Sequence, residues 1–307
     1  MTKNKVLVLG GTGMLGTMVV DVLSRDAQLS VHATGRDGKL ISTISDKLPG
    51  VVWHELDAWN AVDPSALSCF SGMSWIVNAI GITKPLIAKE DAFENERAIR
   101  VNSLFPSLIN TAAKSVGARV LQIATDCVYS GKDGGYLETD LHEPTDVYGK
   151  SKSLGEVRDE NFFNIRSSII GPEPKSPKFL LEWFLGQTKN SQVNGFTNHD
   201  WNGVTTLQFS KIVHGLIKSD ISLPNVCHVI GSDIVTKSTL LKIFSDAYDR
   251  RDIQINDTEA ASVIDRTLDC GNKDLNNQIW SAAGYSAPPT IKDMVQELAE
   301  FDYRSVR

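Results

Sequence analysis

The chain has 307 residues, with 31 Lys and Arg against 37 Asp and Glu, a formal net charge of −6 and no long basic run. This length favours one large domain with a smaller second lobe, and the acidic balance argues against a nucleic-acid partner. The four cysteines form no C-x-x-C pair and the six histidines show no metal-ligand spacing with them, so we expect reduced thiols, a cytoplasmic location and no metal. No run reaches the ~20 apolar residues of a membrane span, and the N-terminal apolar run is too short for a signal segment, so we expect a soluble protein without a membrane partner.

The first predicted elements are a strand and a glycine-rich turn. The apolar run KVLVL at 5–9 leads into GGTGMLG at 10–16, which is followed by an apolar helical pattern. Both Gly11-x-Gly13-x-x-Gly16 and Gly10-x-x-Gly13-x-x-Gly16 fit a turn that brings backbone amides to a dinucleotide pyrophosphate, with a merely tight turn as the alternative. The residues expected to contact the cofactor here are Gly10, Thr12, Gly13, Met14, Leu15 and Gly16.

The second predicted strand, 29–36, ends where an acidic side chain would hold the ribose of NAD or an arginine would accept the 2′-phosphate of NADP. The residues found are Thr34, Gly35 and Arg36. We therefore expect NADPH rather than NADH. Asp37 complicates this choice, and an exposed loop charge is the alternative for Arg36.

Further strands are predicted at 51–56 and 74–81, and one long amphipathic helix over 93–117. The second of these strands ends in mostly small residues that would let the ribose and nicotinamide of the cofactor approach closely. They are Asn78, Ala79, Ile80 and Gly81. In the following loop we expect Thr83 and Lys84 to face the active site.

The chemistry is predicted to centre on 122–156. The strand VLQIA ends at Thr125 and Asp126, on the edge where doubly wound sheets place ligands. Tyr148 and Lys152 lie four residues apart, hence on one face of a helix, where the cation would lower the phenol pKa and make the tyrosine a usable proton donor for an alkoxide. The Thr125 hydroxyl could bond the same oxygen. Tyr-x-x-x-Lys alone arises by chance, so its weight comes from the turn at 10–16 and the Thr-Asp strand end.

The C-terminal half alternates short predicted elements. The predicted strands are 161–174, broken at Gly171-Pro172, then 193–206 with a turn, 225–231 and 252–256. The predicted helices are 179–189, 206–217, 236–250 and 291–301, with a polar stretch ending at 274–280.

The segments ATDCVYSG at 124–131 and EPTDVYGKSKSLGE at 143–156 are similar to those of extended short-chain dehydrogenases/reductases, in particular the dTDP-4-dehydrorhamnose reductases and related nucleotide-sugar reductases. The resemblance implies an α/β fold with a doubly wound parallel Rossmann sheet. Residues 1–171 would form the NADP-binding domain and 172–307 mainly a smaller α/β substrate lobe, with segments near 204–231 packing back on the first.

The resemblance also implies a reaction, the NADPH-dependent reduction of the 4-keto group of a nucleotide-linked deoxy sugar. Tyr148 would give its proton to the alkoxide, Lys152 would keep the tyrosine acidic and bind the nicotinamide ribose, and Thr125 would hold the carbonyl oxygen. Asp57 and Ala58 match the position that meets the adenine. Asn102 matches an asparagine that holds the active-site helix or a water relay, with a purely structural role as the alternative.

The expected substrate contacts come from both lobes. Asp126 would hold a substrate hydroxyl or orient the loop, unless it is only a turn residue. The expected substrate residues are Thr83, Lys84, Thr125, Asp126, Cys127, Tyr148, Lys178, Trp201 and Asn202, with Lys175 and Arg266 as further candidates. Each lysine could instead be a solvated charge, and Trp201 a core residue.

Two departures from the family pattern leave alternatives open. Thr125-Asp126-Cys127 lacks the glutamate of related dehydratases, which favours reduction, while Cys127 and Tyr129-Ser130-Gly131 replace the usual aromatic residue and Phe-Asp-Gly and leave the sugar open. Cys127 could be an epimerase acid or a pocket-lining residue. The alternative functions are therefore a nucleotide-sugar epimerase and a non-catalytic NADP-binding regulatory subunit, although an intact Thr-Tyr-Lys set argues against the second. A homodimer is one candidate assembly.

Overall fold

The computed structural model describes residues 4–88, 91–174, 178–219 and 221–304. Its main feature is a sheet of seven parallel strands in the order β11-β6-β5-β4-β1-β2-β3. The order reverses between β1 and β4, which is the point where open α/β sheets bind ligands. The strands are β1 Asn4–Leu9, β2 Leu29–Gly35, β3 Val52–Glu55, β4 Trp75–Asn78, β5 Arg119–Ala124, β6 Phe162–Arg166 and β11 Val226–His228.

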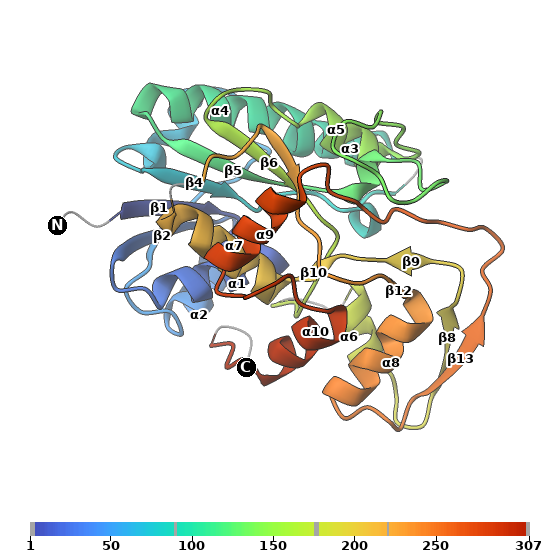
Figure 1. The fold of residues 1–307 in the computed structure, drawn as a ribbon. Coiled ribbons are helices and arrows are strands. Elements are labelled where there is room, and N and C mark those ends of the chain that lie inside the picture. The colour runs from blue at the N-terminus through green and yellow to red at the C-terminus, as the bar shows by residue number, and fades with distance from the viewer. Residues whose placement is uncertain (1–3, 89–90, 175–177, 220, 305–307) are drawn as a thin grey trace.

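Helices cover both faces of this sheet (Figure 1). Successive side chains of a strand point to opposite faces, so Val6 and Val8 of β1 join one core while Leu7 and Leu9 join the other. The first face carries α1 Met14–Ser24, α2 Gly38–Ser45, α7 Thr206–Lys218 and α9 Lys273–Ala282, and the second carries α3 Ala92–Ile99, α4 Phe105–Val116 and α5 Val147–Leu154. The predicted doubly wound α/β fold is confirmed.

The long helix predicted over 93–117 is interrupted. The turn η3, Arg100–Leu104, is π-helical, and the Phe105 N–H bonds the carbonyl of Arg100, five residues earlier. Pro106 follows in the first turn of α4 and has no N–H to continue the regular ladder. Gly117 ends α4 in the left-handed conformation.

The polar stretch predicted before Trp280 is also different from what the sequence suggested, because it forms α9. Asn272 caps this helix by accepting from the Leu275 N–H, and Asn276, Ile279 and Trp280 form a buried stripe on an otherwise polar helix. The short elements between the main strands are η1 Pro64–Phe70, η2 Lys84–Leu86 and η4 Asp126–Val128.

The smaller lobe is made of short pieces around α6 Leu180–Leu185, α8 Lys237–Ala247 and α10 Ile291–Glu300. Three two-stranded sheets join distant segments, and one apolar core runs from β1 and α1 into this lobe. The pairs are β7 Ile169–Ile170 with β10 Val204–Thr205, β9 Asp200–Trp201 with β12 Val235–Thr236, and β8 Gln192–Phe196 with β13 Gln254–Thr258. Helix α7 packs on α1, while the proposed division near residue 171 stays a prediction.

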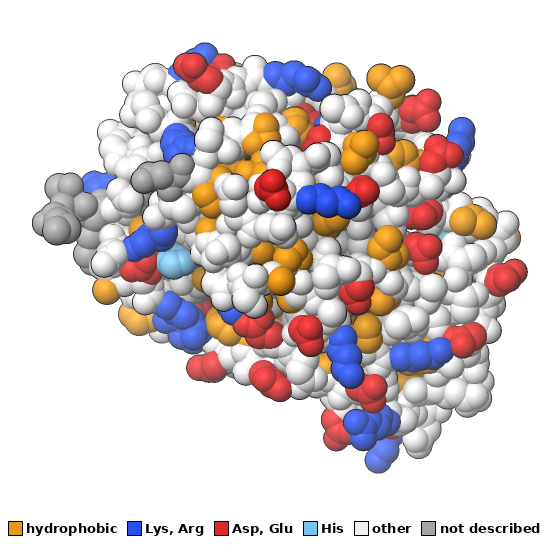
Figure 2. Space-filling model, in the orientation of Figure 1, with side chains coloured by type: hydrophobic (Ala, Val, Ile, Leu, Met, Phe, Trp, Pro, Cys, Tyr) orange, Lys and Arg blue, Asp and Glu red, His pale blue; other side chains and the backbone are white. Residues whose placement is uncertain are grey.

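The outer surface mixes acidic and basic side chains over the face seen in Figure 2. In the part of the chain that the structure describes, no helix is both long and apolar enough to cross a membrane.

Candidate active site

The turn after β1 is built so that side chains are kept out of it. Gly10 has a left-handed φ of 79°, and the Gly13 N–H donates to the Gly10 carbonyl at 2.9 Å. Gly13 then starts α1 without any side-chain cap, so the first amides of the helix point outward from the turn. A Cβ on Gly16 would lie 2.0 Å from the Gly10 oxygen, which explains why glycine is required there.

The end of β2 supports this turn with Thr34 rather than presenting Thr34 to a ligand. The buried Thr34 hydroxyl accepts from the Gly10 N–H at 3.0 Å. Asp37 accepts from the N–H groups of Lys39 and Leu40 and caps α2, so its carboxylate has a structural task. Arg36 lies exposed between them.

The ends of β3 and β4 also hold their polar side chains in local bonds. Asp57 accepts from the Trp59 N–H and the Asn60 amide, both at 3.1 Å, and closes the turn after β3, next to the buried Ala58. Asn78 is buried and donates to Gln122 at 2.7 Å, which ties β4 to β5.

The segment after β4 lies against the glycine turn. The Ala79 N–H donates to the Leu9 carbonyl at 3.0 Å, and a Cβ on Gly10 would meet Ile80 at 2.8 Å. Further along the same segment, the Thr83 hydroxyl is buried and has no hydrogen-bond partner among the described residues. These contacts bring 79–80 and the turn 10–16 together at one edge of the sheet.

Asn102 connects this segment to the helix that carries the tyrosine. Its amide accepts from the Ile82 N–H at 2.8 Å and donates to the Ile82 carbonyl at 2.9 Å and to the Ser151 hydroxyl at 3.0 Å. The neighbouring Ser103 hydroxyl donates to the Ser151 carbonyl at 2.7 Å. These bonds support a role for Asn102 in holding the active-site helix α5 in place, because they connect Asn102 to Ser151 of that helix.

The predicted trio of Thr125, Tyr148 and Lys152 comes together where β5 meets α5. The hydroxyl of the buried Thr125 donates to Asp126 at 3.0 Å and accepts from the Cys127 N–H at 3.2 Å. Helix α5 packs directly against this loop, because a Cβ on Gly149 would lie 2.2 Å from the Cys127 carbonyl.

The start of α5 is fixed by Asp146. This residue caps the helix by accepting from the Gly149 N–H at 2.9 Å, and it pairs with the Lys84 ammonium, also at 2.9 Å. Lys84 therefore anchors the helix that carries Tyr148, and its side chain remains half exposed.

The pKa values of Tyr148 and Lys152 differ from those predicted from the sequence. Burial raises the pKa of Tyr148 above its ordinary value, with Cys127 adding to the effect, while a hydrogen bond with Thr125 lowers it. Burial lowers the pKa of Lys152 to about 8, and its ammonium donates to the Ile123 carbonyl at 2.6 Å. The predicted lowering of the Tyr148 pKa by Lys152 is therefore not found, and the tyrosine keeps its proton at neutral pH.

Cys127 is also protonated at neutral pH. Burial raises the pKa of its thiol to about 12, and the Asp126 carboxylate acts in the same direction. A thiol in this state is a poor base.

The residues predicted from the smaller lobe have mainly structural contacts. Trp201 is buried and donates to the Ser168 hydroxyl at 2.8 Å, as in the core alternative, and Asn202 exchanges two hydrogen bonds with the backbone of Leu268 at 2.6 and 3.0 Å. Lys178 is exposed, and Lys175 lies outside the described residues.

Two cations of this lobe approach the strand end. Arg266 donates to the carbonyls of Tyr129 and Ser130 at 3.0 and 3.3 Å. The second, Lys237, was missed: its ammonium lies 5.3 Å from the centre of the Trp201 ring, and burial lowers its pKa to about 8 while Asp126 and Cys127 raise it. Lys237 begins α8 and belongs to no recognised motif. Its position near the strand end depends on the pairing of β9 with β12, which the sequence does not show.

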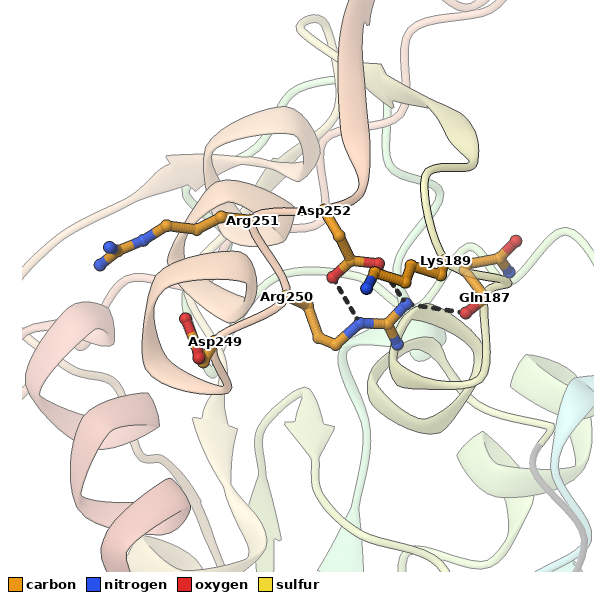
Figure 3. Close-up of a pocket in the computed structure, with 6 residues that line it drawn as sticks. All are labelled: Gln187, Lys189, Asp249, Arg250, Arg251 and Asp252. Atoms are coloured by element: carbon orange, nitrogen blue, oxygen red, sulfur yellow. Dashed lines mark hydrogen bonds and ion pairs between the residues drawn. The ribbon is translucent and has the colours of Figure 1, made fainter.

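A hollow of about 450 Å³ elsewhere in the smaller lobe is a weaker candidate (Figure 3). Its central guanidinium, Arg250, is bound by Asp252 at 2.9 and 3.1 Å and by the carbonyls of Gln187 and Leu185. These partners already use the charge. Within the described ranges, no group of three or more His, Cys, Asp or Glu side chains could hold a metal.

The comparisons with known proteins point to one family. Residues 4–168 match the family model described as the RmlD substrate binding domain. The chain is 28% identical over 198 residues to the dTDP-4-dehydrorhamnose reductase of Aggregatibacter actinomycetemcomitans, covering 62% of this chain and 54% of that protein. It thus spans about half the length of the curated relatives it matches.

Two solved structures share the fold. The dTDP-4-dehydrorhamnose reductase of Bacillus anthracis, in complex with NADP, has a TM-score of 0.70 at 16% identity and covers 96% of this chain and 98% of its own. The UDP-glucuronic acid 4-epimerase of Bacillus cereus, in complex with UDP-glucuronic acid and NAD, has a TM-score of 0.73 at 15% identity and covers 98% of both chains.

Proposed function

Because this chain belongs to the RmlD substrate binding domain family, we propose that it is an NADPH-dependent reductase of the 4-keto group of a nucleotide-linked deoxy sugar, with Tyr148 as the proton donor. One observation carries the proposal. Helix α5 packs on the Thr125 loop at the same sheet edge as the glycine turn, which supports a proton donor at Tyr148 acting beside a dinucleotide held at the turn.

The roles of the trio follow from their protonation. The nicotinamide supplies a hydride to the ketone carbon when the cofactor is bound. Thr125 would hold the ketone oxygen, and Tyr148, protonated because burial raises its pKa, would give its proton to the developing alkoxide. Lys152, still mostly charged at pH 7 with a pKa of about 8, would stabilise the phenolate that remains.

The residues around the glycine turn fit a dinucleotide. Gly13 leaves the N-terminus of α1 open, with no contact nearer than 3.4 Å to an added Cβ, and the helix dipole favours a pyrophosphate there. Asp37 is used as a helix cap, so Arg36 is the residue we assign to the 2′-phosphate of NADPH. The proposed cofactor contacts are Gly10, Thr12, Gly13, Met14, Leu15, Gly16, Arg36, Asp57, Ala58, Ala79, Ile80 and Gly81.

The proposed substrate contacts begin at the strand end. Asp126 and Cys127 would line the sugar site together with Thr83, whose buried hydroxyl lacks a partner in the described chain, and Lys237 would face them from the smaller lobe. The epimerase alternative stays open, because Cys127 would serve there as an acid and its thiol, with its pKa raised to about 12, is protonated at neutral pH. The homodimer and the cytoplasmic location stay predictions.

The test is NADPH oxidation with dTDP-, UDP- and GDP-linked 4-keto-6-deoxy sugars, with wild type beside Tyr148→Phe. We expect one sugar to be turned over by the wild type and turnover to fall roughly 10²- to 10⁴-fold in the variant, with NADPH affinity little changed. Tyr285→Phe, which removes a hydroxyl bonded to Glu297 away from the sheet edge, is the control and should keep full turnover. Tight NADPH binding with no turnover of any sugar would instead favour a regulatory subunit.

A further inference from the structure

A buried guanidinium bonds residues that adjoin the candidate active site. Arg166, at the end of β6, has a side chain that is 1% exposed. Its Nε and Nη2 donate to the two carboxylate oxygens of Glu156, both at 2.7 Å. Its Nη1 donates to the Tyr129 hydroxyl at 2.5 Å and lies 3.3 Å from Nε2 of His228, and its Nη2 lies 2.6 Å from Nε2 of His142.

These partners belong to three separate parts of the site. Glu156 follows α5 and comes four residues after Lys152. Tyr129 ends η4, the turn that begins after Thr125. His228 ends β11, the strand that the smaller half of the chain adds to the sheet. Arg166 therefore contacts the lysine helix, the threonine loop and the added strand at once.

The two histidines explain why this position needs an arginine and not a lysine. His228 donates through Nδ1 to the Asp269 carbonyl, which leaves its Nε2 as an acceptor. Nε2 of His142 must also be an acceptor, because the guanidinium that contacts it can only donate. A guanidinium can serve these acceptors and a bidentate carboxylate together, whereas an ammonium cannot. Burying such a charge costs stability unless every partner is in place.

We propose that Arg166 and Glu156 are positioning residues for the proton-donor pair: Arg166 fixes the Glu156 carboxylate as the counter-charge of Lys152 and holds Tyr129 under the Thr125 loop. The proposal rests on the proposed function in taking Lys152 as the lysine that stabilises the phenolate of Tyr148. Neither Arg166 nor Glu156 touches the reacting groups.

The electrostatics of Lys152 agree with this geometry. Burial lowers its pKa to about 8, and Glu156 acts in the opposite direction by favouring the ammonium. Without the carboxylate the lysine would lose its charge nearer neutral pH and could no longer stabilise a phenolate. The other charged and titratable groups around Arg166 and Glu156 include Tyr129, Glu138, Asp140, His142, Arg158, Cys227 and His228.

The test measures the ionisation of Lys152 directly, without substrate. The protein is labelled with ε-¹³C lysine, the Lys152 signal is assigned from Lys152→Arg, and its titration is followed by NMR in wild type and Glu156→Gln. We expect the Lys152 pKa to fall by about one pH unit in the variant. An unchanged pKa in folded Glu156→Gln would overturn the proposal, since a merely structural ion pair would not move it.

A matched control separates this effect from general weakening. Asp252→Asn breaks a second bidentate arginine–carboxylate pair, with Arg250, in the smaller lobe (Figure 3), and should leave the Lys152 titration unchanged. If Glu156→Gln fails to fold, Glu156→Gln/Arg166→Met, which leaves no unpaired charge, carries the test with a smaller expected fall. Glu156→Asp, which keeps the ion pair and withdraws the carboxylate, should give an intermediate fall.

Activity then distinguishes the two proposals. If wild type reduces a keto sugar, the alkaline limb of its kcat profile should move to lower pH in Glu156→Gln, together with the NMR titration. If wild type reduces none while the NMR shift is found, the proposed function fails and the coupling of Arg166 and Glu156 to Lys152 stands. If kcat changes but neither the limb nor the NMR titration moves, the positioning proposal fails alone.

Discussion

Two stretches on the carboxyl edge of the large sheet, the turn 10–16 after β1 and the region of η4 and α5 after β5, hold their working groups by different means. The turn excludes side chains, so that an added Cβ on Gly16 would lie 2.0 Å from the backbone. The region after β5 depends on buried charges that have partners: Lys152 of α5 donates to the Ile123 carbonyl, and Glu156, just past α5, pairs with Arg166 at the end of β6. The first stretch is therefore sensitive to atoms that are added, and the second to partners that are lost.

Removing Arg166 tests whether the region after β5 is sensitive to the loss of a partner, and it has the largest expected effect on stability. Arg166→Met leaves the Glu156 carboxylate, 4% exposed, without its cation, and we expect the free energy of unfolding to fall by about 3–5 kcal/mol. Urea denaturation measures this. Arg250→Met, which breaks an ion pair whose side chains are about 20% exposed, should cost clearly less stability than Arg166→Met, and equal losses would contradict the comparison.

Adding one methyl group to the turn 10–16 tests whether this turn is sensitive to added atoms. Gly16→Ala should lower the free energy of unfolding by about 1–3 kcal/mol, because the Gly10 carbonyl must move. Gly13→Ala has no contact nearer than 3.4 Å and should keep its stability while losing cofactor affinity, because the methyl group fills the cradle. Thermal unfolding and NADPH fluorescence titration separate the two, and a stable Gly16→Ala would refute the steric argument.

The cofactor choice assigned to Arg36 gives a smaller effect at the edge of the same stretch. Arg36→Ala should weaken NADPH binding about 10-fold, equivalent to about 1.4 kcal/mol, and leave NADH binding unchanged. Titration of both cofactors measures the ratio. Lys39→Ala, which removes a nearby exposed cation from α2, is the control, and equal losses for both cofactors in Arg36→Ala would reject the assignment.

The last prediction is a pH dependence of stability from the histidines around Arg166. Burial lowers the pKa of both His142 and His228 below the ordinary value of 6.5, so the unfolded chain takes up their protons first as the pH falls. The free energy of unfolding should therefore be retained above about pH 6.5 and decline below it, by at most about 1.4 kcal/mol per pH unit for each histidine. Denaturation at pH 7 and pH 5 measures the decline, and His228→Gln should reduce it; an unchanged slope would exclude His228.

The comparison of the turn 10–16 with the region after β5 also explains which features could be predicted from the sequence. The turn 10–16 and the strands β1, β2, β4 and β5 follow from local signals, glycine spacing and apolar runs. The Tyr148 and Lys152 pair follows from helical spacing and from a family resemblance. These features depend on residues close together in the chain.

The partners of Arg166 could not be read in this way, because they lie 10 to 62 residues from it. Tyr129 and Glu156 stand in the family-like segments, but nothing in those segments indicates that Arg166 binds them. An arginine inside the apolar run FFNIR was the available signal. Helix α9 escaped prediction because only a narrow stripe of it is buried. The π-helical turn at 100–104 escaped although Pro106, which has no N–H for the regular ladder, was a local signal for it.

The pairing of β11 with β6 also sets an order of events during synthesis. His228 emerges 62 residues after Arg166, which at typical rates of translation is roughly 3–12 s later. Until then the outer edge of β6 has unpaired backbone groups, and Arg166 lacks one of its partners. We expect nascent chains in this interval to be the state most exposed to aggregation and most dependent on chaperones. The match to the family model ends at residue 168, before the residues of β11.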